Sequence, residues 1–235
     1  MASKRYEQAL TLVDRKKSYS LEEAIAVLKE FPAVKFDETV ELSVSLGIDP
    51  KKTDQIVRGI VLLPHGTGKT QRVLVFCKGE HELIAKQAGA DYVGSSEFIE
   101  KIQNGWLDFD VAIATPELMR EVSRLGKILG PRGLMPSPKA GTVTDDVRKA
   151  ITEVKRGKVE FKMDKLANLH IVIGKRSFEA RQLIENATAV LTAVVRAKSA
   201  ATKGRFIRRV SLSSTMSPGL AVDVQPFLVE EEDAD

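Results

Sequence analysis

The stretch KFDETVELSVSL, residues 35–46, decides the fold of the chain. From Val40 to Leu46 apolar residues alternate with polar ones. Because successive side chains of a strand point to opposite faces, this pattern predicts a strand with one buried face. Residues 35–39 supply a cation, an aromatic ring and a hydroxyl, which suit contacts with a phosphate, a base and a ribose 2′-hydroxyl. Taken alone, they are more typical of an ordinary strand start with solvated polar side chains.

Composition limits the class of protein. The 235 residues, 43% of them hydrophobic and 29% charged, suffice for one large domain or two modest ones. The net charge of +4 is unevenly distributed. Residues 159–228 carry eleven Lys and Arg residues against five Asp and Glu, whereas residues 229–235 carry five acidic residues and no basic one. This distribution favours a polyanionic partner and predicts a disordered acidic tail at 229–235.

The single cysteine, Cys77, excludes an internal disulfide and is typical of a reducing compartment. Because it follows the apolar run 73–76, we expect a buried thiol without a catalytic role. The first residues lack the apolar core of a signal peptide, and no apolar run approaches the roughly 20 residues that span a membrane. We therefore expect a cytoplasmic protein that does not enter membranes.

The two ends of the chain share one-sided patterns. Apolar spacing predicts a helix over residues 6–13, and Ser20 with Glu23 predicts a capping box for a second helix that ends before Pro32. A second alternating strand is expected at about 55–63. Since a polar turn separates it from the first strand, the two are predicted to pair in an antiparallel sheet.

The same one-sided alternation returns late in the chain, over residues 159–163 and 169–173. A long amphipathic helix from about 178 to 196 follows. The last strand is expected at 205–212, where strict alternation puts Arg208 on the apolar face. Its side chain is therefore predicted to lie at an edge or to extend toward solvent.

The middle of the chain has a different pattern. Residues 73–77 and 110–114 are short, largely apolar runs, as expected of strands buried on both faces, and helical segments alternate with them. The sequence therefore predicts an α+β domain with a split antiparallel sheet and helices, residues 1–66 and 159–228. An inserted α/β domain, residues 67–158, interrupts it, and the two crossings between the domains would permit hinge motion.

Gly66-Thr67-Gly68-Lys69-Thr70 resembles the end of a nucleotide-binding P-loop, so a nucleotide-binding α/β enzyme is the alternative interpretation. The complete motif has a glycine where this chain has Leu63. It also opens into a helix, whereas here the segment enters the predicted strand at 73–77. A glycine-rich crossing between the two domains explains the segment better.

Other catalytic and metal motifs are missing from the sequence. The first buried strand of the middle segment is not followed by the Gly-x-Gly-x-x-Gly of dinucleotide sites. The three histidines, His65, His81 and His170, do not have metal-ligand spacing, and Ser, Cys and His form no nucleophile motif. We therefore expect no catalysis, no metal and no cofactor.

Three stretches fit RNA binding better than catalysis. They are residues 35–41, 165–177 and 213–219, which carry cations and hydroxyl groups, and in the last case Met216 within a polar loop. Each is weak evidence by itself, because strand starts and polar turns have similar compositions and a Met can fill a core. All three fall in the domain that is assembled from both ends of the chain.

Short motifs along almost the whole chain match one family, in the family's order. Among them are KFDETVE at 35–41, LGPRGLMP at 129–136, PKAGTV at 138–143, GKRSF at 174–178 and STM at 214–216. By these residues the chain resembles the bacterial large-subunit ribosomal protein L1 family, whose members belong to the mobile ribosomal stalk.

The resemblance implies two domains, of which the second is a three-layer, Rossmann-like insertion. It implies that the first domain binds large-subunit rRNA at the stalk and that the protein takes part in releasing deacylated tRNA from the exit site. It further implies that the protein represses translation by binding the mRNA of its own operon. No enzymatic activity is implied.

Carried over to this sequence, the family's rRNA contacts fall on twelve residues. They are Lys35, Phe36, Thr39, Glu41, Lys165, His170, Lys175, Ser177, Thr215, Met216, Ser217 and Gly219. One of them departs from the family's pattern, because glycine commonly follows Thr-Met and this chain has Ser217. If that glycine adopts a positive φ or admits RNA backbone, a Cβ is unfavourable there, and the loop would use Gly219 instead.

Overall fold

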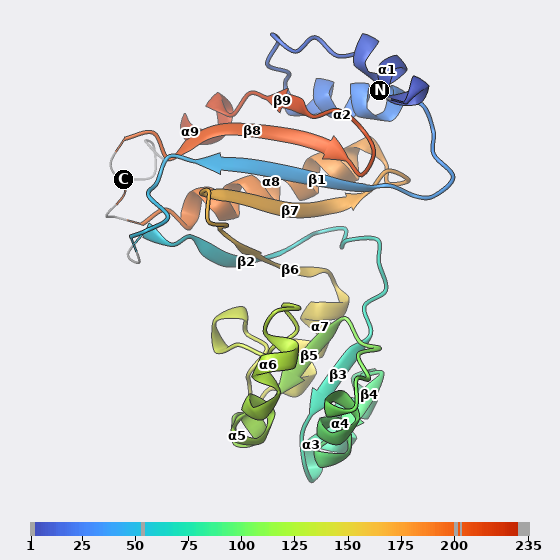
Figure 1. Ribbon diagram of the computed structural model, residues 1–235, viewed down its shortest axis with the longest axis vertical. Helices are drawn as coiled ribbons and strands as arrows, with labels where there is room; N and C mark the ends of the chain where they lie inside the picture. Colours follow the sequence, from blue (N-terminus) through green and yellow to red (C-terminus); the bar gives the residue numbers. More distant parts are fainter. Residues whose placement is uncertain (1–2, 53–54, 200–201, 203, 230–235) are drawn as a thin grey trace. The chain divides into compact units, whose positions relative to one another are not determined.

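The computed structural model describes residues 3–52, 55–199, 202 and 204–229. It divides into two compact units. Met1–Gly68 and Val159–Asp235 form one, which we call the outer unit, and Lys69–Lys158 form the other, the inserted unit. Each has its own sheet and helices (Figure 1), so the chain is a mixed α/β protein with several sheets.

The outer unit is built on a four-stranded sheet with the order β7-β1-β8-β9. Its strands are β1 (Thr39–Leu46), β7 (Asn168–Lys175), β8 (Ile207–Ser214) and β9 (Leu220–Val222). The predicted alternation of β1 is confirmed, since every second residue from Val40 to Leu46 is buried. β1 is antiparallel to both of its neighbours, β7 and β8.

The predicted pairing of the first two strands is wrong. β2 (Arg58–Leu62) pairs instead with β6 (Lys158–Lys162) in a separate two-stranded sheet. Both edges of β1 are occupied by β7 and β8, so its backbone groups have no place for a third strand. β2 and β6 are the strands through which the chain leaves and re-enters the outer unit.

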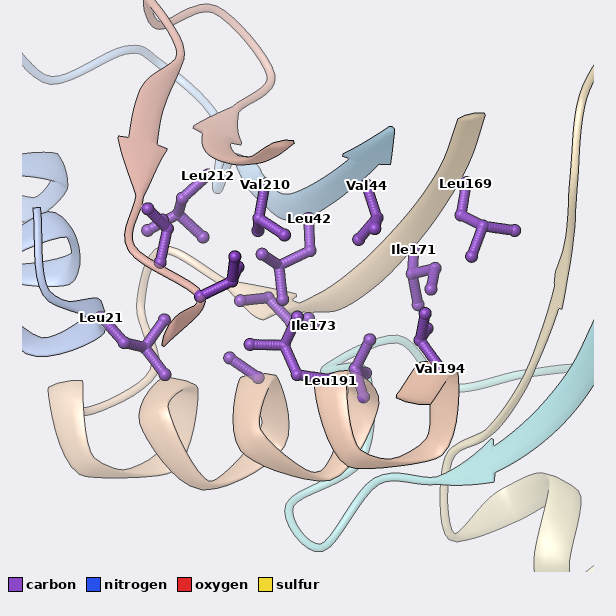
Figure 2. Close-up of a cluster of buried hydrophobic side chains, with 14 of the residues drawn as sticks. Leu21, Leu42, Val44, Leu169, Ile171, Ile173, Leu191, Val194, Val210 and Leu212 are labelled. Atoms are coloured by element: carbon purple, nitrogen blue, oxygen red, sulfur yellow. The ribbon is translucent and has the colours of Figure 1, made fainter. Parts of the chain in front are cut away.

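One face of the four-stranded sheet is covered by α8 (Ala180–Arg196), which runs along it (Figures 1 and 2). Leu42, Ile171 and Val210 from the sheet belong to the same buried cluster as Leu191 and Val194 from the helix. Full burial of each such side chain contributes about 1.5–3 kcal/mol relative to exposure. This packing determines which face of the sheet is left for solvent.

Shorter helices complete the outer unit: α1 (Lys4–Thr11), α2 (Leu21–Glu30) and α9 (Gln225–Val229). The predicted cap of α2 is present, because the Ser20 hydroxyl accepts a hydrogen bond from the Glu23 amide. The Glu23 carboxylate pairs with Lys17 at 3.0 Å. Of the two hydrogen bonds of a capping box, the one accepted by the Ser20 side chain is therefore the one that forms. The predicted acidic tail lies outside the described residues, apart from Val229 at the end of α9.

A β-bulge overturns the predicted placement of Arg208. In the pairing of β1 with β8, Ser45 faces Arg209 and Leu46 faces Ile207, which leaves Arg208 without a partner in register. Ile207 is buried, whereas Arg208 and Arg209 are both exposed. The extra residue shifts the alternation by one position, so Arg208 faces solvent and has no need to extend past apolar neighbours.

A second bulge lies near the start of β1. Val40 faces Gly174 and Glu41 faces Val172, so β7 carries one extra residue between them. Gly174 has φ +152°, and a Cβ there would lie 2.9 Å from a ring atom of Phe178. Only glycine fits this position, and directly after it the chain leaves β7 for the turn that leads to α8.

The inserted unit is organised around a three-stranded parallel sheet with the order β4-β3-β5. The elements of this sheet and its longer helices are β3 (Val73–Phe76), α3 (Glu80–Gln87), β4 (Tyr92–Gly94), α4 (Ser96–Gln103), β5 (Val111–Ala114) and α7 (Val147–Lys155). Short helical turns lie between β5 and α7: η2 (Pro116–Leu118), α5 (Met119–Val122), η3 (Ser123–Leu125), α6 (Gly126–Leu129) and η4 (Pro138–Ala140).

Both faces of the parallel sheet are buried. Every residue of β3 is buried, as predicted for this apolar run. Leu74 and Phe76 pack in a cluster with residues of α4 and α5, whereas Val73 and Val75 pack with residues of α3 and α7. Cys77 is buried too, and burial raises the pKa of its thiol to about 11, so the thiol stays protonated at neutral pH.

Candidate nucleic-acid interface

The face of the outer sheet that points away from the α8 core is polar, and we call it the open face. On β1 it carries Thr39, Glu41, Ser43 and Ser45, each half-buried between fully buried neighbours. β7 adds His170 and β8 adds Arg209, both exposed. One-sided alternation therefore leaves hydroxyl, carboxylate, imidazole and guanidinium groups available to a polar partner.

A buried ion pair lies where β1 begins. Glu38 is 1% exposed, and one oxygen of its carboxylate accepts a hydrogen bond from the Arg176 guanidinium at 3.0 Å. The other oxygen accepts from the backbone amide of Met216 at 3.0 Å. Arg176 also donates to the carbonyls of Lys29 and Phe31. This pair joins the end of α2, the start of β1, the β7–α8 turn and the β8–β9 loop.

Hydrogen bonds around this pair bring four predicted site residues together. Lys175 Nζ donates to Thr39 Oγ1 at 2.9 Å. The Thr215 hydroxyl accepts from the Thr39 amide at 3.0 Å. Asp37 holds Ser177, since its carboxylate accepts from the Ser177 amide at 3.1 Å and from the hydroxyl at 2.7 Å. These side chains have defined positions before any partner binds.

Two large apolar side chains are exposed at the same end of the sheet. Phe36, in the bend before β1, is 53% exposed, and Met216, in the β8–β9 loop, is 50% exposed. Lys35 is exposed next to Phe36. Exposed apolar groups among cations and hydroxyls are typical of surfaces on which an RNA base stacks while its phosphate meets a cation.

The Ser217 position does not require glycine. Among the described residues other than glycine, only Ala167 has a positive φ. The Ser217 hydroxyl accepts a hydrogen bond from the Ser214 amide at 2.8 Å, which closes the β8–β9 loop. Gly219 is exposed, and a Cβ there would meet only Ser211 Cβ at 4.0 Å. The loop therefore accommodates a serine at 217 and uses its hydroxyl internally.

Two predicted residues lie away from this end. His170 is on β7 opposite Ser43, and its Nδ1 lies 3.1 Å from the Ser43 hydroxyl. Lys165 is in the turn before β7, beyond the other end of β1, where the Leu46 amide donates to the Ala167 carbonyl. The eight residues of β1 put its ends about 24 Å apart. The predicted residues therefore follow the length of the open face and do not surround one pocket.

Sequence reasoning missed the residues that organise this end. Glu38 and Arg176 lie within the predicted RNA-binding stretches 35–41 and 165–177, yet neither is among the twelve expected contacts, because a charged residue in a polar segment gives no sign that it is buried. Asp37, which orients Ser177, was missed for the same reason. The available signal was their position inside the two stretches that supply the predicted cations and hydroxyls.

The P-loop-like segment does not have the geometry of a phosphate site. Gly68 has φ +73°, and a Cβ there would lie 2.7 Å from Lys175 Cγ. Lys69 Nζ pairs with Asp110 at 2.7 Å, and this hydrogen bond lowers the pKa of Asp110 to about 2. Residues 66–72, all of them described, contain no helix. The segment therefore lacks the helix N-terminus that holds phosphates in a P-loop.

Within the part of the chain that the structure describes, no group of three or more His, Cys, Asp and Glu side chains is placed to hold a metal ion. None of the described helices has both the length and the apolar character required to cross a bilayer.

A polar sheet face that carries cations, hydroxyl groups and exposed apolar side chains is typical of proteins that bind nucleic acid by surface contacts. Residues 28–218 match the ribosomal protein L1p/L10e family. The chain is 58% identical over 223 residues to the large ribosomal subunit protein uL1 of Kosmotoga olearia, a match that covers 95% of this chain and 96% of that relative. The chain therefore belongs to the ribosomal protein L1p/L10e family. The predicted family is confirmed, and membership makes the chain a ribosomal protein of the large subunit and not a nucleotide-binding enzyme.

Proposed function

We propose that the protein binds large-subunit rRNA at the ribosomal stalk through the open face of its outer unit. The observation that carries the proposal is the buried Glu38–Arg176 pair, which holds segments far apart in the sequence at one end of that face. These segments carry the exposed side chains of Phe36 and Met216. Family membership supports rRNA as the partner.

The groups at the start of β1 each suit a particular contact with RNA. Phe36 offers a ring on which an unpaired base can stack, and Met216 offers a flexible apolar contact. The Lys175 ammonium group has three N–H donors, of which Thr39 and the Asp37 carbonyl take two. The third remains for a phosphate. Because the cation is already positioned, binding requires less ordering than a free lysine would.

The remaining predicted residues extend the contact along the sheet. Glu41 and His170 lie on the open face, and Lys165 lies beyond its far end. A contact area of this length suits recognition of a folded RNA by its shape and 2′-hydroxyls, with phosphate contacts that weaken as salt rises.

The domain assignment and two further roles belong to the same proposal. Residues 1–66 and 159–228 are the rRNA-binding domain, and residues 67–158 are a Rossmann-like insertion. The family resemblance supports participation in release of deacylated tRNA from the exit site. It also supports repression by binding the mRNA of the protein's own operon. If that mRNA folds like the rRNA site, both RNAs bind the open face and compete for it.

Titration of a stalk-rRNA fragment at several salt concentrations tests the proposal. We expect Phe36→Ala to weaken binding about tenfold or more, since stacking of one base on an aromatic side chain contributes about 1–3 kcal/mol. Met216→Ala should also weaken binding, because it removes a flexible apolar contact. The logarithm of the binding constant should also fall linearly with the logarithm of the salt concentration.

Leu83→Ala is the matched control, because Leu83 is an exposed apolar residue on α3 of the inserted unit. It should leave the affinity unchanged. Circular dichroism establishes that each variant is folded. Folded Phe36→Ala and Met216→Ala variants that bind RNA like the unmodified protein would refute the proposal.

A further inference from the structure

A polar hollow of about 370 Å³ lies beside the proposed interface, within the outer unit. Its lining includes Tyr6 on α1, Arg15 in the segment after α1, Arg209 and Ser211 on β8, and Gly219 in the β8–β9 loop. Ligand pockets commonly span about 300–1,000 Å³. The hollow is thus at the small end of that range, and it is suited to a group of the size of one nucleotide.

The walls of the hollow are held in place without a ligand. Arg5 on α1 donates to the carbonyl of Met216, which joins the helix to the β8–β9 loop. After α1, the Tyr19 amide donates to the Ala221 carbonyl at 2.9 Å. The Tyr19 hydroxyl accepts from the Asp14 amide at 2.8 Å. The segment that carries Arg15 is therefore tied to β9, and a ligand would enter a site that is already formed.

Two guanidinium groups line the hollow, those of Arg15 and Arg209. Both residues are exposed, and neither guanidinium group has a hydrogen-bond or ion-pair partner among the described residues. The Asp14 carboxylate also lines the hollow, where it accepts from the Lys16 amide at 2.9 Å, so these three charged groups leave one net positive charge. A guanidinium presents donors in a fork that matches the oxygens of a phosphate. The charge of the hollow therefore favours an anion.

The other lining groups suit the rest of a nucleotide. Tyr6 is half-buried, and its ring is available to a base. Ser211 pairs in register with Ser43 of β1, which itself faces His170 of β7. The hollow therefore continues the open face toward α1, so a strand of RNA lying on that face would reach it.

We propose that this hollow receives one nucleotide of the bound RNA, with its phosphate between Arg15 and Arg209 and its base against Tyr6. The inference rests on the proposed function. It adds a contact made by residues outside the twelve that the family resemblance supplies; of those twelve, Gly219 alone lines the hollow. It also gives α1, which lies outside the matched family region of residues 28–218, a part in RNA binding.

The test is titration of the same stalk-rRNA fragment with the Arg15→Ala, Arg209→Ala and doubly substituted proteins. Loss of each phosphate contact should weaken binding about tenfold at moderate salt and lower the salt slope by about one. Tyr6→Ala should also weaken binding, whereas Tyr6→Phe should not, because the ring remains. The matched control is Arg196→Ala, an exposed arginine at the end of α8 with the same change of charge.

The outcomes separate this inference from the function on which it rests. If Phe36→Ala and Met216→Ala weaken binding but the double arginine variant behaves like Arg196→Ala, the hollow does not contact RNA and only this inference fails. If the Phe36 and Met216 variants bind normally, the proposed function fails. If adenosine monophosphate binds the hollow while the double variant binds RNA normally, the hollow is a small-molecule site and the inference is wrong.

Discussion

The two larger sheets of this protein bury different numbers of faces. In the outer unit, β1 alternates between buried and half-buried residues, and the buried ones belong to the hydrophobic core between the sheet and α8. In the inserted unit, β3 is buried throughout, with a separate core on each side. The antiparallel sheet thus keeps a face for a partner, whereas the parallel sheet uses both faces for its own stability.

This difference separates binding from folding within one chain. Polar residues on the open face are free to take part in recognition, because burial of the opposite face already stabilises the strand. In the inserted sheet the same polar residues would be buried and costly. The interface nevertheless depends on one buried polar element, the Glu38–Arg176 pair. Substitutions in this pair test the difference between the two sheets most directly.

Arg176→Ala is expected to have the largest effect on stability. Removing one partner of a buried ion pair commonly costs about 3–5 kcal/mol, because the other charge stays buried without compensation. Unfolding by denaturant, followed by far-ultraviolet circular dichroism, measures the change. Glu121→Ala is the control: Glu121 pairs with Lys78 at 3.0 Å on the surface, and exposed pairs contribute about 0–1 kcal/mol. Equal losses in the two variants would show that the buried pair has no special structural role.

The same substitution in both sheets sharpens the comparison. Val75→Thr puts a hydroxyl on β3, where it would be buried in the core formed with α3 and α7, and should destabilise by about 1–3 kcal/mol. Val172→Thr changes the open face of β7 and should stay within about 0.5 kcal/mol. The only tryptophan of the sequence, Trp106, lies in the inserted unit. Its fluorescence therefore measures unfolding of the Val75→Thr variant, and circular dichroism measures unfolding of the Val172→Thr variant. A cost at Val172 equal to that at Val75 would contradict the assignment of an open face.

The smallest expected effect is the pH dependence of the inserted unit. The pKa of Asp110 is lowered from 3.8 to about 2, mainly by its hydrogen bond with Lys69. A lowered pKa means stabilisation that is complete above about pH 4 and is lost as the pH falls toward about 2. We expect a loss of about 1 kcal/mol over that range, because the pair is partly screened by solvent. Trp106 fluorescence during denaturation measures it, and Asp110→Asn should remove this part of the pH dependence; an unchanged profile would exclude Asp110 as its source.

Much of the fold could be predicted from local patterns. The alternation of residues 40–46, the Ser20 cap and the apolar run at 73–76 each reflect interactions between neighbours in the sequence, and each is confirmed. The difference between residues 66–70 and a P-loop is also local, since it consists of a missing glycine and a strand in place of a helix. Of the twelve predicted site residues, those around Thr39 come together, and their contacts with RNA stay a prediction.

The failures concern long-range pairing. The hairpin expected between the first two strands does not form, because β7 and β8, distant in the sequence, occupy both edges of β1. Arg208 faces solvent because one extra residue in β8 shifts its alternation, and a bulge leaves no local mark in the sequence. β9, which carries one wall of the hollow, is too short for its alternation to be recognised.

By itself, the sequence determined that residues 35–46 form a one-sided strand and that the chain belongs to a family of ribosomal proteins. Only the tertiary structure decided what lies at the start of that strand. Glu38 holds distant segments together because folding buries it against Arg176, 138 residues away, and against the β8–β9 loop that carries Met216. Local periodicity records which side of a strand faces the core. Which charges meet there depends on the order of strands in the sheet, and that order is set by the packing of segments far apart in the chain.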